Sequence, residues 1–251
     1  MTPDAGSIRI LQDRALDGPT NMARDEALMV HVGAGDSPAT LRLYQWDPPT
    51  ISLGYFQHYA DYAALPPPAG ELAVVRRLTG GGAILHDLEL TYSLTLPIGH
   101  PLLTRGPNRL YEIAHDAVIA ALVAANLSTQ RCGCSDDSGA ARGPFFCFAR
   151  RHCYDVLLGR DKIAGSAQRR TRQAVLQHGS IILGNRFAQQ PTAQSGEAFD
   201  TLLACVRAGF GESFSTAAGM MLEPGDWSES ELQSSDRLLA KYAGDEWTRR
   251  L

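Results

Sequence analysis

The sequence predicts an α+β fold in which a mixed, largely antiparallel sheet is flanked by helices. Short segments of alternating or continuous apolar residues, typical of strands, recur along the chain, and four longer segments space their apolar residues as a helix does. The two kinds of segment do not follow the regular strand–helix–strand order of a parallel α/β sheet. Because the 251 residues show no internal repeat, we expect one domain over 1–251, with its core at about 36–215 and a short helical C-terminal extension at about 226–251.

The first half of the chain predicts six strands and one helix. The helix, at 21–32, follows a start signal at 17–20 and places Met22, Ala27 and Val30 at helical spacing. Residues 40–46 alternate apolar and polar side chains like a half-buried strand that Pro48 ends. The strands are expected at 7–12, 40–46, 51–55, 72–76, 83–86 and 90–96.

The second half predicts three helices, a β-hairpin and a further strand. The clearest helix, 107–127, places Leu110, Ile113, Ala117 and Ala121 on one apolar stripe. The remaining segments are a flexible loop at 132–144, a hairpin of 154–158 and 162–169, a strand at 174–183, an exposed polar segment at 185–196, and helices at 199–210 and 229–242.

Composition excludes several classes of protein. The chain carries 23 Lys and Arg against 27 Asp and Glu, so no overall positive field attracts nucleic acid or an anionic membrane. No segment approaches the roughly 18 apolar residues of a membrane span, and the N-terminal residues lack the basic and apolar parts of a secretory signal. The five cysteines have no disulfide-scaffold spacing. We expect a cytoplasmic monomer that binds neither nucleic acid nor membrane.

Three consecutive glycines, Gly80 to Gly82, follow Arg76 and Arg77 and separate two apolar segments. Glycine has no Cβ, so its backbone can adopt positive φ and let another molecule lie against its peptide groups. We interpret the run as a ligand-binding loop with arginine charge nearby. The alternative is a plain glycine-rich turn beside two arginines that sit in solvent.

The hairpin carries a lysine on a strand of small residues. Alternation predicts that Lys162, Ala164, Ser166 and Gln168 share one face, and Gly165 allows close backbone approach. A lysine there could contact an anion, polarise a carbonyl or lower the pKa of a neighbouring thiol. The alternative is a surface lysine beside a β-turn.

Cysteine is the natural nucleophile for thioester exchange, and nearby positive charge activates it. Cys147 follows a loop and precedes Arg150 and Arg151, which makes it the leading candidate. Cys205 lies on an apolar helix face, where a core role is expected. Zinc is not expected, because the Cys-x-Cys pair at 132–134 has no second pair at ligand spacing.

His86 and His178 are candidates to bond a substrate carbonyl or to shuttle a proton, with a structural role as the alternative for each. The sequence contains no Gly-x-Ser-x-Gly elbow, no Walker A motif and no Rossmann fingerprint.

Together these segments resemble the lipoate-protein ligase and octanoyltransferase family, relatives of the biotin protein ligases, and among them the cysteine-dependent octanoyltransferase branch. The similar motifs are Leu43-Tyr44-Gln45-Trp46, Arg76-Arg77-x-x-Gly80-Gly81-Gly82-Ala83-x-x-His86-Asp87, Cys147-Phe148, Lys162-Ile163-Ala164-Gly165-Ser166-Ala167-Gln168 and Leu176-Gln177-His178-Gly179-Ser180-Ile181.

The resemblance implies the catalytic-domain fold of biotin and lipoate protein ligases. It also implies octanoyl transfer from octanoyl-acyl carrier protein to a lysine of a lipoyl domain, or of the glycine-cleavage H protein, without a cofactor or a metal. It assigns Cys147 as the acyl-thioester nucleophile, and Lys162 as the residue that lowers the pKa of this cysteine and contacts the acyl carbonyl. The implied substrate-binding residues are Arg76, Gly80, Gly81, Gly82, Ala83, His86, Gly165, Ser166, Ala167, His178 and Gly179.

Three alternatives stay open. The first is an ATP- and Mg-dependent lipoate-protein ligase that acts through an acyl-adenylate, to which the third glycine, Gly82, is more similar. The second is an amidotransferase that takes octanoyl groups from the glycine-cleavage H protein. The third is a non-catalytic module that binds an acyl group or a carrier protein.

Overall fold

The structure is a computed structural model, and it describes residues 6–133 and 143–251. Within these residues, a large mixed sheet has the strand order β11-β1-β2-β6-β10-β9-β8-β7. Strands β2 and β11 pair with β1 in parallel, and all other neighbours in this sheet are antiparallel. The strands are β1 (Ser7–Leu16), β2 (Thr40–Trp46), β6 (Glu89–Pro97), β7 (Thr129–Arg131), β8 (Val156–Leu158), β9 (Asp161–Arg170), β10 (Ala174–Ile182) and β11 (Met221–Pro224).

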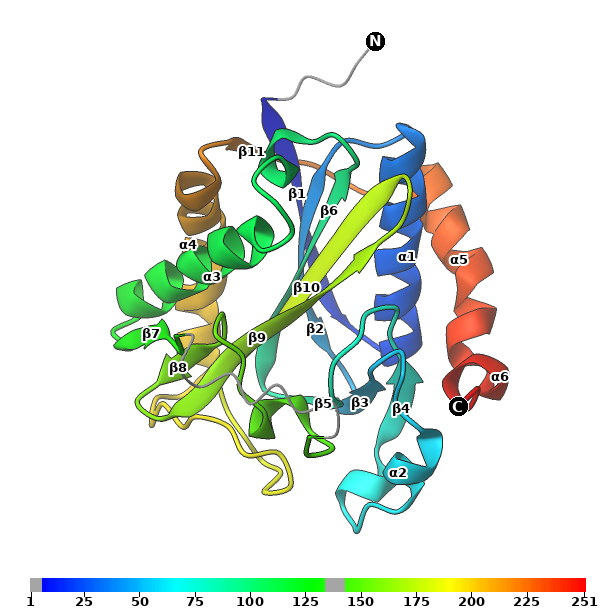
Figure 1. Cartoon of the computed structure of the whole chain (residues 1–251), viewed down its shortest axis with the longest axis vertical. Helices are drawn as coiled ribbons and strands as arrows, with labels where there is room; N and C mark the ends of the chain where they lie inside the picture. Colours follow the sequence, from blue (N-terminus) through cyan, green and yellow to red (C-terminus); the bar gives the residue numbers. More distant parts are fainter. Residues whose placement is uncertain (1–5, 134–142) are drawn as a thin grey trace.

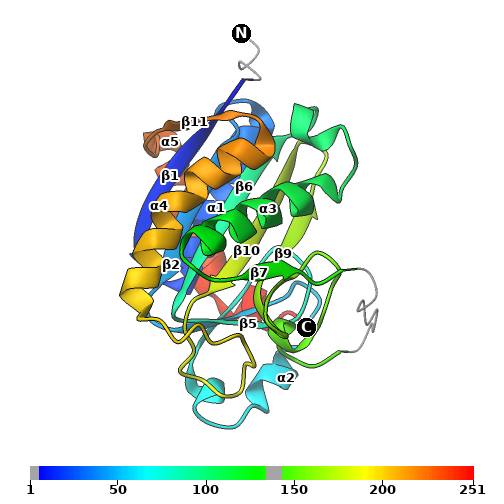
Figure 2. The same ribbon diagram turned by 90° about the vertical axis from the view of Figure 1, so that its left-hand side faces the viewer.

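Helices cover both faces of the large sheet (Figures 1 and 2). Helices α3 (Arg109–Ala124) and α4 (Phe199–Ala218) pack together on one face, and α1 (Gly18–Ala34) packs on the other and is covered by α5 (Glu229–Ala243). Asp17 caps α1 by accepting a hydrogen bond from Thr20 N at 2.7 Å, and Gly35 ends the helix in the left-handed conformation. The predicted α+β class is therefore confirmed.

The main core lies between the large sheet and the α3–α4 layer. Alternate residues of β2, β6 and β10 meet the apolar stripes of both helices, and Leu94, Val118 and Phe210 are fully buried there. Burial of this apolar surface is the main stabilising contribution, about 25 cal/mol per Å². The opposite face of the sheet carries more polar side chains, and it is this face that reaches the cavity described below.

A three-stranded sheet lies at one end of the large sheet, at the bottom of Figure 1. Its strands are β4 (Ala73–Arg76), β3 (Thr50–Leu53) and β5 (Ile84–His86), with β3 parallel to β4 and antiparallel to β5. A second apolar cluster, which includes Ile51, Leu85 and Phe146, packs this sheet against the segment before Cys147. The short helices α2 (Tyr59–Ala63) and α6 (Asp245–Thr248) also belong to this end of the molecule.

Every predicted helix and strand is present, and β2 has the predicted bounds. The short elements α2, α6, β7 and β11 were not predicted, because each is too short for a periodic pattern. The loop predicted at 132–144 falls mostly on 134–142, outside the described residues. Across the part of the chain that the structure describes, no helix combines the length and apolar character needed to cross a bilayer.

Two predictions about exposure are wrong. Gln190, in the segment predicted to be exposed, is buried because its side-chain amide bonds both the N–H and the C=O of Leu85 at 2.8 Å. Cys205, predicted to be core, is exposed on α4. In both cases tertiary packing, which periodicity does not encode, decides which side of the segment faces inward.

Candidate active site

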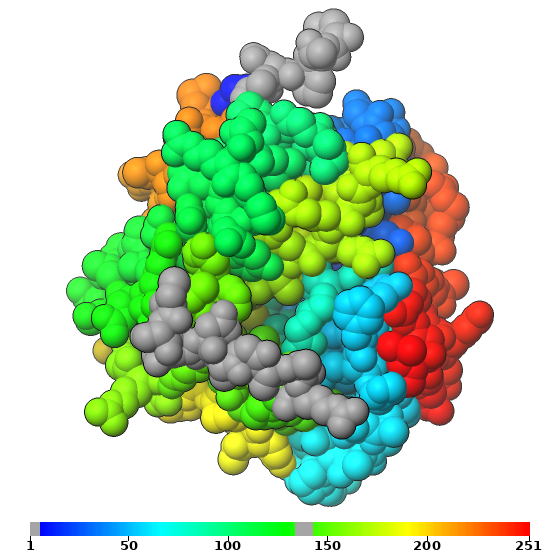
Figure 3. Space-filling view, viewed as in Figure 1, coloured from blue at the N-terminus to red at the C-terminus, as the bar shows by residue number. Residues whose placement is uncertain are grey.

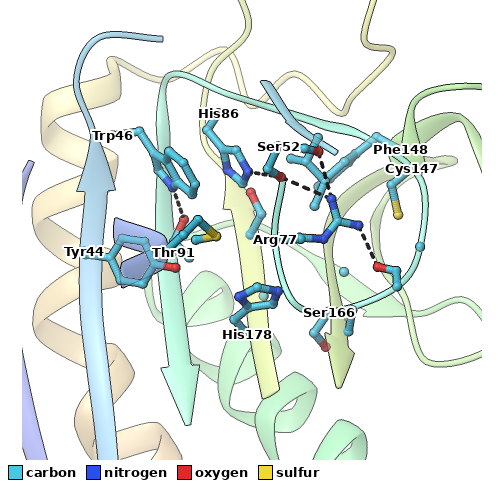
Figure 4. A pocket seen from close by; sticks show the side chains of 18 residues that line it. Tyr44, Trp46, Ser52, Arg77, His86, Thr91, Cys147, Phe148, Ser166 and His178 are labelled. Atoms are coloured by element: carbon cyan, nitrogen blue, oxygen red, sulfur yellow. Dashed lines mark hydrogen bonds between the residues drawn. The ribbon is translucent and has the colours of Figure 1, made fainter. Parts of the chain in front are cut away.

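A cavity lies between the large sheet and the small sheet, and Cys147 stands at one end of it. In Figure 4 the aromatic side chains of Tyr44 and Trp46 lie on one side of the cavity, and Cys147 and Phe148 lie on the other. The other lining residues are Met22, Ser52, Arg77, Gly80, Gly81, Ile84, His86, Thr91, Gly165, Ser166, Ala167, His178, Gly179 and Ser180. The surface of the cavity is largely apolar.

The glycine loop, residues 77–83, joins β4 to β5 and forms one wall. Gly81 has a φ of +93°, which a residue with a Cβ rarely adopts. The Arg77 guanidinium holds the loop, since its Nη2 donates to the carbonyls of Gly80 and Gly82 at 2.7 Å each. Arg76 and Arg77 are both buried, so the alternative that they sit in solvent is wrong.

The end of the glycine loop also positions Cys147. The Cys147 N–H donates to the Ala83 carbonyl at 2.7 Å, and the Ala83 N–H donates to the Phe145 carbonyl at 2.9 Å. A Cβ on Gly82 would lie 3.0 Å from Cys147 N, which leaves no room for a larger residue without movement of the cysteine segment. The third glycine therefore has a packing reason here that does not involve a nucleotide.

Lys162 is the nearest cation to the cysteine sulfur in the described part of the site. Its Nζ lies 3.7 Å from Cys147 Sγ and 2.8 Å from Asp155 Oδ2, and the residue is only 4% exposed. Burial alone would lower the pKa of Lys162, but the neighbouring Cys147 sulfur and the Asp155 carboxylate outweigh it, so this pKa is raised. The lysine is therefore a permanent cation at neutral pH, and the alternative of a surface lysine is wrong.

Lys162 does not share a strand face with Ser166, contrary to the prediction from alternation. The β8–β9 pairing shifts register between Val156 and Leu157, so β9 contains an irregularity just after Lys162. The lysine side chain consequently passes over Gly165, where a Cβ would lie 2.8 Å from Nζ. The Ser166 hydroxyl instead bonds His115 Nε2 of α3 at 2.6 Å.

His86 is held in one tautomer beneath the cavity. Its Nδ1 donates to Glu89 Oε1 at 2.9 Å because a carboxylate can only accept, so its Nε2 accepts from Ser52 Oγ at 2.8 Å. Burial lowers the pKa of His86 despite the neighbouring Glu89 carboxylate, and the ring is neutral. Trp46 stacks on the ring with centroids 3.8 Å apart, which fixes its orientation.

His178 connects the glycine loop to α1. Its Nε2 bonds Thr79 Oγ1 at 2.6 Å and its Nδ1 lies 3.3 Å from Asp25 Oδ2. Burial would raise the pKa of Asp25, but bonds from His178 and the charge of Arg42 outweigh it, and this carboxyl is ionised. Sequence reasoning missed Asp25, Thr79 and Arg77 because no local pattern indicates that segments so far apart converge.

The structure brings most of the predicted site residues together around this cavity. Gly80, Gly81, His86, Gly165, Ser166, Ala167, His178 and Gly179 line it with Cys147. Arg76 does not, because its guanidinium donates to the carbonyls of Gly54, Gln57 and Thr248 behind the small sheet. Ala83 contributes through its backbone bonds to the cysteine segment.

A second, more polar cavity begins at the same sulfur. It shares Gly80, Gly81, Cys147, Ser166 and Ala167 with the first cavity and adds Gly82, Tyr111, Arg150, Arg151, His152, Asp155, Lys162 and Gln168. Cys147 thus stands where an apolar space meets an outer, mainly basic one. Among residues 6–133 and 143–251, no three His, Cys, Asp or Glu side chains gather as a metal site would require.

Comparison with known proteins agrees with this geometry. The model of the lipoyl protein ligase A/B catalytic domain matches residues 17–204, which include the glycine loop, Cys147 and Lys162. The chain belongs to this family. Octanoyltransferase LipM of Kyrpidia tusciae is 34% identical, with 92% of this chain and 94% of that protein covered. The LipM of Symbiobacterium thermophilum is also 34% identical, over 96% of this chain and 98% of that protein.

Solved structures of the lipoyl protein ligase family share the fold. A lipoate-protein ligase A bound with ATP has a TM-score of 0.75 at 21% identity, covering 97% of this chain and 98% of that one. A bipartite lipoate protein ligase of Thermoplasma acidophilum, described together with its E2 lipoyl domain, has a TM-score of 0.70 at 20% identity, covering 97% and 96%. At these identities the likeness shows the ligase catalytic fold alone.

Proposed function

We propose that this protein is an octanoyltransferase that moves an octanoyl group from an acyl carrier protein thioester to a lipoyl-domain lysine through Cys147. The relatives that bear the name octanoyltransferase, 34% identical over more than 90% of both chains, support octanoyl transfer in lipoylation. The observation that carries the mechanism is the Cys147 sulfur, which lies 3.7 Å from the Lys162 cation at the mouth of an apolar cavity.

In the first half-reaction the Cys147 thiolate attacks the thioester carbonyl of the donor. The bond from the acyl carbon to the carrier sulfur breaks, and the carrier thiol leaves with a proton. Lys162 lies close enough to the sulfur to stabilise the thiolate and the oxyanion that forms on the acyl carbonyl. The acyl chain extends into the cavity toward Trp46 and Tyr44, where contact with apolar side chains is favourable.

In the second half-reaction the amine of the target lysine attacks the acyl-enzyme. An amide forms, the amine loses a proton, and the Cys147 thiolate is released for the next cycle. Thioester exchange is nearly thermoneutral and amide formation is downhill, so the proposed cycle needs neither ATP nor a metal. A thiol nucleophile must remain reduced, which agrees with the cytoplasmic location that we propose.

The rim of the cavities suits an acidic protein partner. The Tyr55 ring lies between the guanidinium groups of Arg169 and Arg250, whose centres are 5.0 and 3.6 Å from the ring centroid. Phe56, 73% exposed, stacks edge-on against Tyr55 and lies beside Gly80. Figure 3 shows the yellow-green hairpin, the cyan segments and the red C-terminal residues meeting on this face.

The rim arginines are available to a partner. No ion pair within the described residues involves Arg169 or Arg250. The overall charge of the chain is −4, so these side chains form a local basic surface on an acidic protein. We propose that the protein is a monomer. The acyl carrier protein and the lipoyl domain then dock on this surface one after the other.

Mass spectrometry of the protein after incubation with octanoyl-acyl carrier protein tests the proposal. We expect a mass increase of one octanoyl group on the peptide containing Cys147, and its loss when an apo lipoyl domain is added. Cys147→Ser should form no releasable adduct, whereas Cys205→Ser, on the exposed side of α4, should behave as the wild type. Transfer by Cys147→Ser at the wild-type rate would refute the role of this cysteine.

The same assay separates the remaining candidates. Activity with free octanoate or lipoate plus ATP, but without the Cys147 adduct, would indicate a ligase, whose fold the structure shares. Acylation of Cys147 by octanoylated glycine-cleavage H protein but not by the carrier protein would indicate an amidotransferase. Binding of the carrier without any adduct or transfer would indicate a non-catalytic module.

A further inference from the structure

Arg77 is a buried cation for which the described residues provide no anion. Its guanidinium donates to Ser52 O at 2.8 Å, to Thr79 Oγ1 at 3.1 Å and to the Gly80 and Gly82 carbonyls at 2.7 Å. All these acceptors are neutral, and no ion pair of residues 6–133 and 143–251 includes Arg77. Burying a cation that is 2% exposed and has no counter-charge costs free energy, and an anion that forms close to it would lower this cost.

The other charges that face the sulfur are already balanced or exposed to water. Lys162 is paired with Asp155 at 2.8 Å, so together they contribute little net charge. The buried carboxylates Glu89 and Asp25 line neither cavity: Glu89 accepts from the neutral His86 ring, and Asp25 is paired with Arg42 at 2.8 Å. Arg150 lies at the outer cavity, donates to the Pro144 carbonyl at 2.7 Å and is partly exposed, so water screens its charge.

The backbone brings Arg77 and the cysteine sulfur to the same point. Arg77 Nη2 bonds the Gly82 carbonyl, and the next carbonyl, that of Ala83, accepts from the N–H of Cys147. Both side chains line the same cavity, and Figure 4 shows the guanidinium beside the cysteine end of it. Burial lowers the pKa of Arg77 to about 10, and the Cys147 sulfur is the first neighbour that opposes this by favouring the charged form.

We propose that Arg77 supplies the uncompensated positive charge that stabilises the Cys147 thiolate, in addition to fixing the glycine loop. Lys162 then acts as a neutralised partner close to the sulfur, and Arg77 sets the net potential there. The inference rests on the proposed role of Cys147 as nucleophile. Arg77, the second arginine of the glycine-loop motif, is thereby assigned an electrostatic effect on the Cys147 sulfur rather than a contact with the acyl group.

The pH dependence of Cys147 alkylation by iodoacetamide tests this, with the modified peptide quantified by mass spectrometry. We expect Arg77→Gln to move the midpoint of the alkylation profile up by about one pH unit, which is about tenfold in rate below the midpoint. Arg77→Lys keeps the positive charge but loses the forked hydrogen bonds, and its alkylation midpoint should stay close to that of the wild type. Arg76→Gln is the matched control, because Arg76 is equally buried and also donates only to neutral carbonyls, but lies away from the cavity.

The inference is overturned if folded Arg77→Gln keeps the wild-type midpoint, or if Arg77→Lys and Arg76→Gln shift it as far as Arg77→Gln does. A second variant, Lys162→Met with Asp155→Asn, keeps the test decisive if Arg77→Gln does not fold. It removes a neutral pair, so its midpoint should stay close to that of the wild type. An upward shift of about one pH unit in this variant would equally overturn the inference.

Alkylation does not require a carrier protein, so this experiment and the octanoyl adduct fail independently. A shifted alkylation profile without an octanoyl adduct would leave the Arg77 inference standing and remove the proposed transfer. An octanoyl adduct with an unshifted alkylation profile would support the proposed transfer and overturn the Arg77 inference.

Discussion

Cys147 is held by backbone bonds to the glycine loop and faces one close side-chain cation. The Ala83 carbonyl accepts from its N–H at 2.7 Å, and Lys162 Nζ lies 3.7 Å from its sulfur. The first contact fixes where the sulfur stands, and the second places an ammonium group beside it. Because the two contacts come from different segments, substitutions can separate position from charge.

Lys162→Met should slow acylation of Cys147 about 100-fold, since the oxyanion loses its nearest cation and the Asp155 carboxylate is left unpaired close to the sulfur. Stopped-flow acylation by octanoyl-acyl carrier protein measures the change. Lys241, the other lysine of the chain, bonds Glu26 of α1 and lines neither of the two cavities, so Lys241→Met should acylate normally. A rate within twofold of the wild type in Lys162→Met would contradict the assigned role.

The raised pKa of Lys162 gives a pH prediction. A group whose pKa is higher in the folded state keeps its charge, and the stability tied to it, until the pH rises through that folded value. Loss of the Lys162 charge should therefore not lower the wild-type acylation rate until the pH exceeds about 10.5, the ordinary value for a lysine. A fall centred near pH 9 in the same stopped-flow assay would argue that the lysine is not held as a cation.

Gly82→Ala tests the packing of the loop against the cysteine segment. The new Cβ would lie 3.0 Å from Cys147 N and Phe145 O, both backbone atoms, so the cysteine segment must move. We expect acylation to fall about tenfold, because small displacements of a reacting group are costly. Gly209→Ala in α4, where a Cβ meets nothing within 4 Å, should leave acylation unchanged and raise the melting temperature slightly.

At the scale of elements, α5 is attached to β1 and to the segment before β2 by one carboxylate. Glu231 accepts from Arg9 Nη1 at 3.1 Å and from Ser37 Oγ at 2.7 Å. It also accepts from the Ser228 N–H at 2.8 Å, and this bond is part of the capping box at the start of the helix. Burial would raise the pKa of Glu231, but these bonds outweigh it and lower the pKa to about 2. One side chain therefore both begins α5 and holds it on the sheet.

Glu231→Gln should destabilise the protein by about 3 kcal/mol at pH 7, the typical cost of breaking a buried pair. Since the folded pKa is lowered, this stabilisation is present above about pH 4.5 and is lost as the pH falls toward 2. Urea unfolding at pH 7 and pH 3.5 should therefore show a smaller difference between variant and wild type at the lower pH. Glu229→Gln, exposed in the same helical turn, is the control, and an equal effect there would contradict the assignment.

At the scale of the whole molecule, the cavity lies between the large sheet and the small sheet. Trp46 and Tyr44 come from the large sheet, and Ser52 and His86 come from the small sheet, so neither sheet alone forms the cavity. The β9–β10 hairpin and the C-terminal residues flank the opening on the outside. A partner that docks on this face reaches Cys147 through the outer cavity.

Phe56→Ala should raise the KM for octanoyl-acyl carrier protein several-fold without changing the melting temperature, because the ring is 73% exposed and contributes little to folding. Met221→Ala is the matched control, since Met221 is 66% exposed on β11, at the opposite edge of the large sheet from β9. Steady-state kinetics at two salt concentrations provides the measurement. If Phe56→Ala and Met221→Ala give the same KM, the rim is not the docking surface.

Local sequence was sufficient for the elements and for much of the site. Periodicity located α1, β2 and α3, because alternate and helical spacing of apolar residues reflects burial directly. The glycine run and the order of the cysteine and lysine motifs indicated the family, and they are the basis for proposing Cys147 as the nucleophile. These features lie within short segments, where neighbouring residues determine the backbone.

The face that Lys162 presents was decided only by tertiary structure. The register shift against β8 turns its side chain away from Ser166 and over Gly165 toward the sulfur. Pairing of β9 with β8 produces this irregularity. Alternation along β9 alone predicts that Lys162 and Ser166 lie on the same face of the strand.

The charges around the sulfur were also decided only by the fold. Two adjacent arginines look alike in the sequence, yet Arg76 bonds carbonyls behind the small sheet while Arg77 faces the cavity with Cys147. His178, Asp25 and Thr79 come from three distant segments and meet only when the sheets pack. The sequence by itself determined the longer elements and the candidate reactive groups, because both depend on neighbouring residues. The structure decided which charges are buried together, because that depends on contacts between residues far apart in the chain.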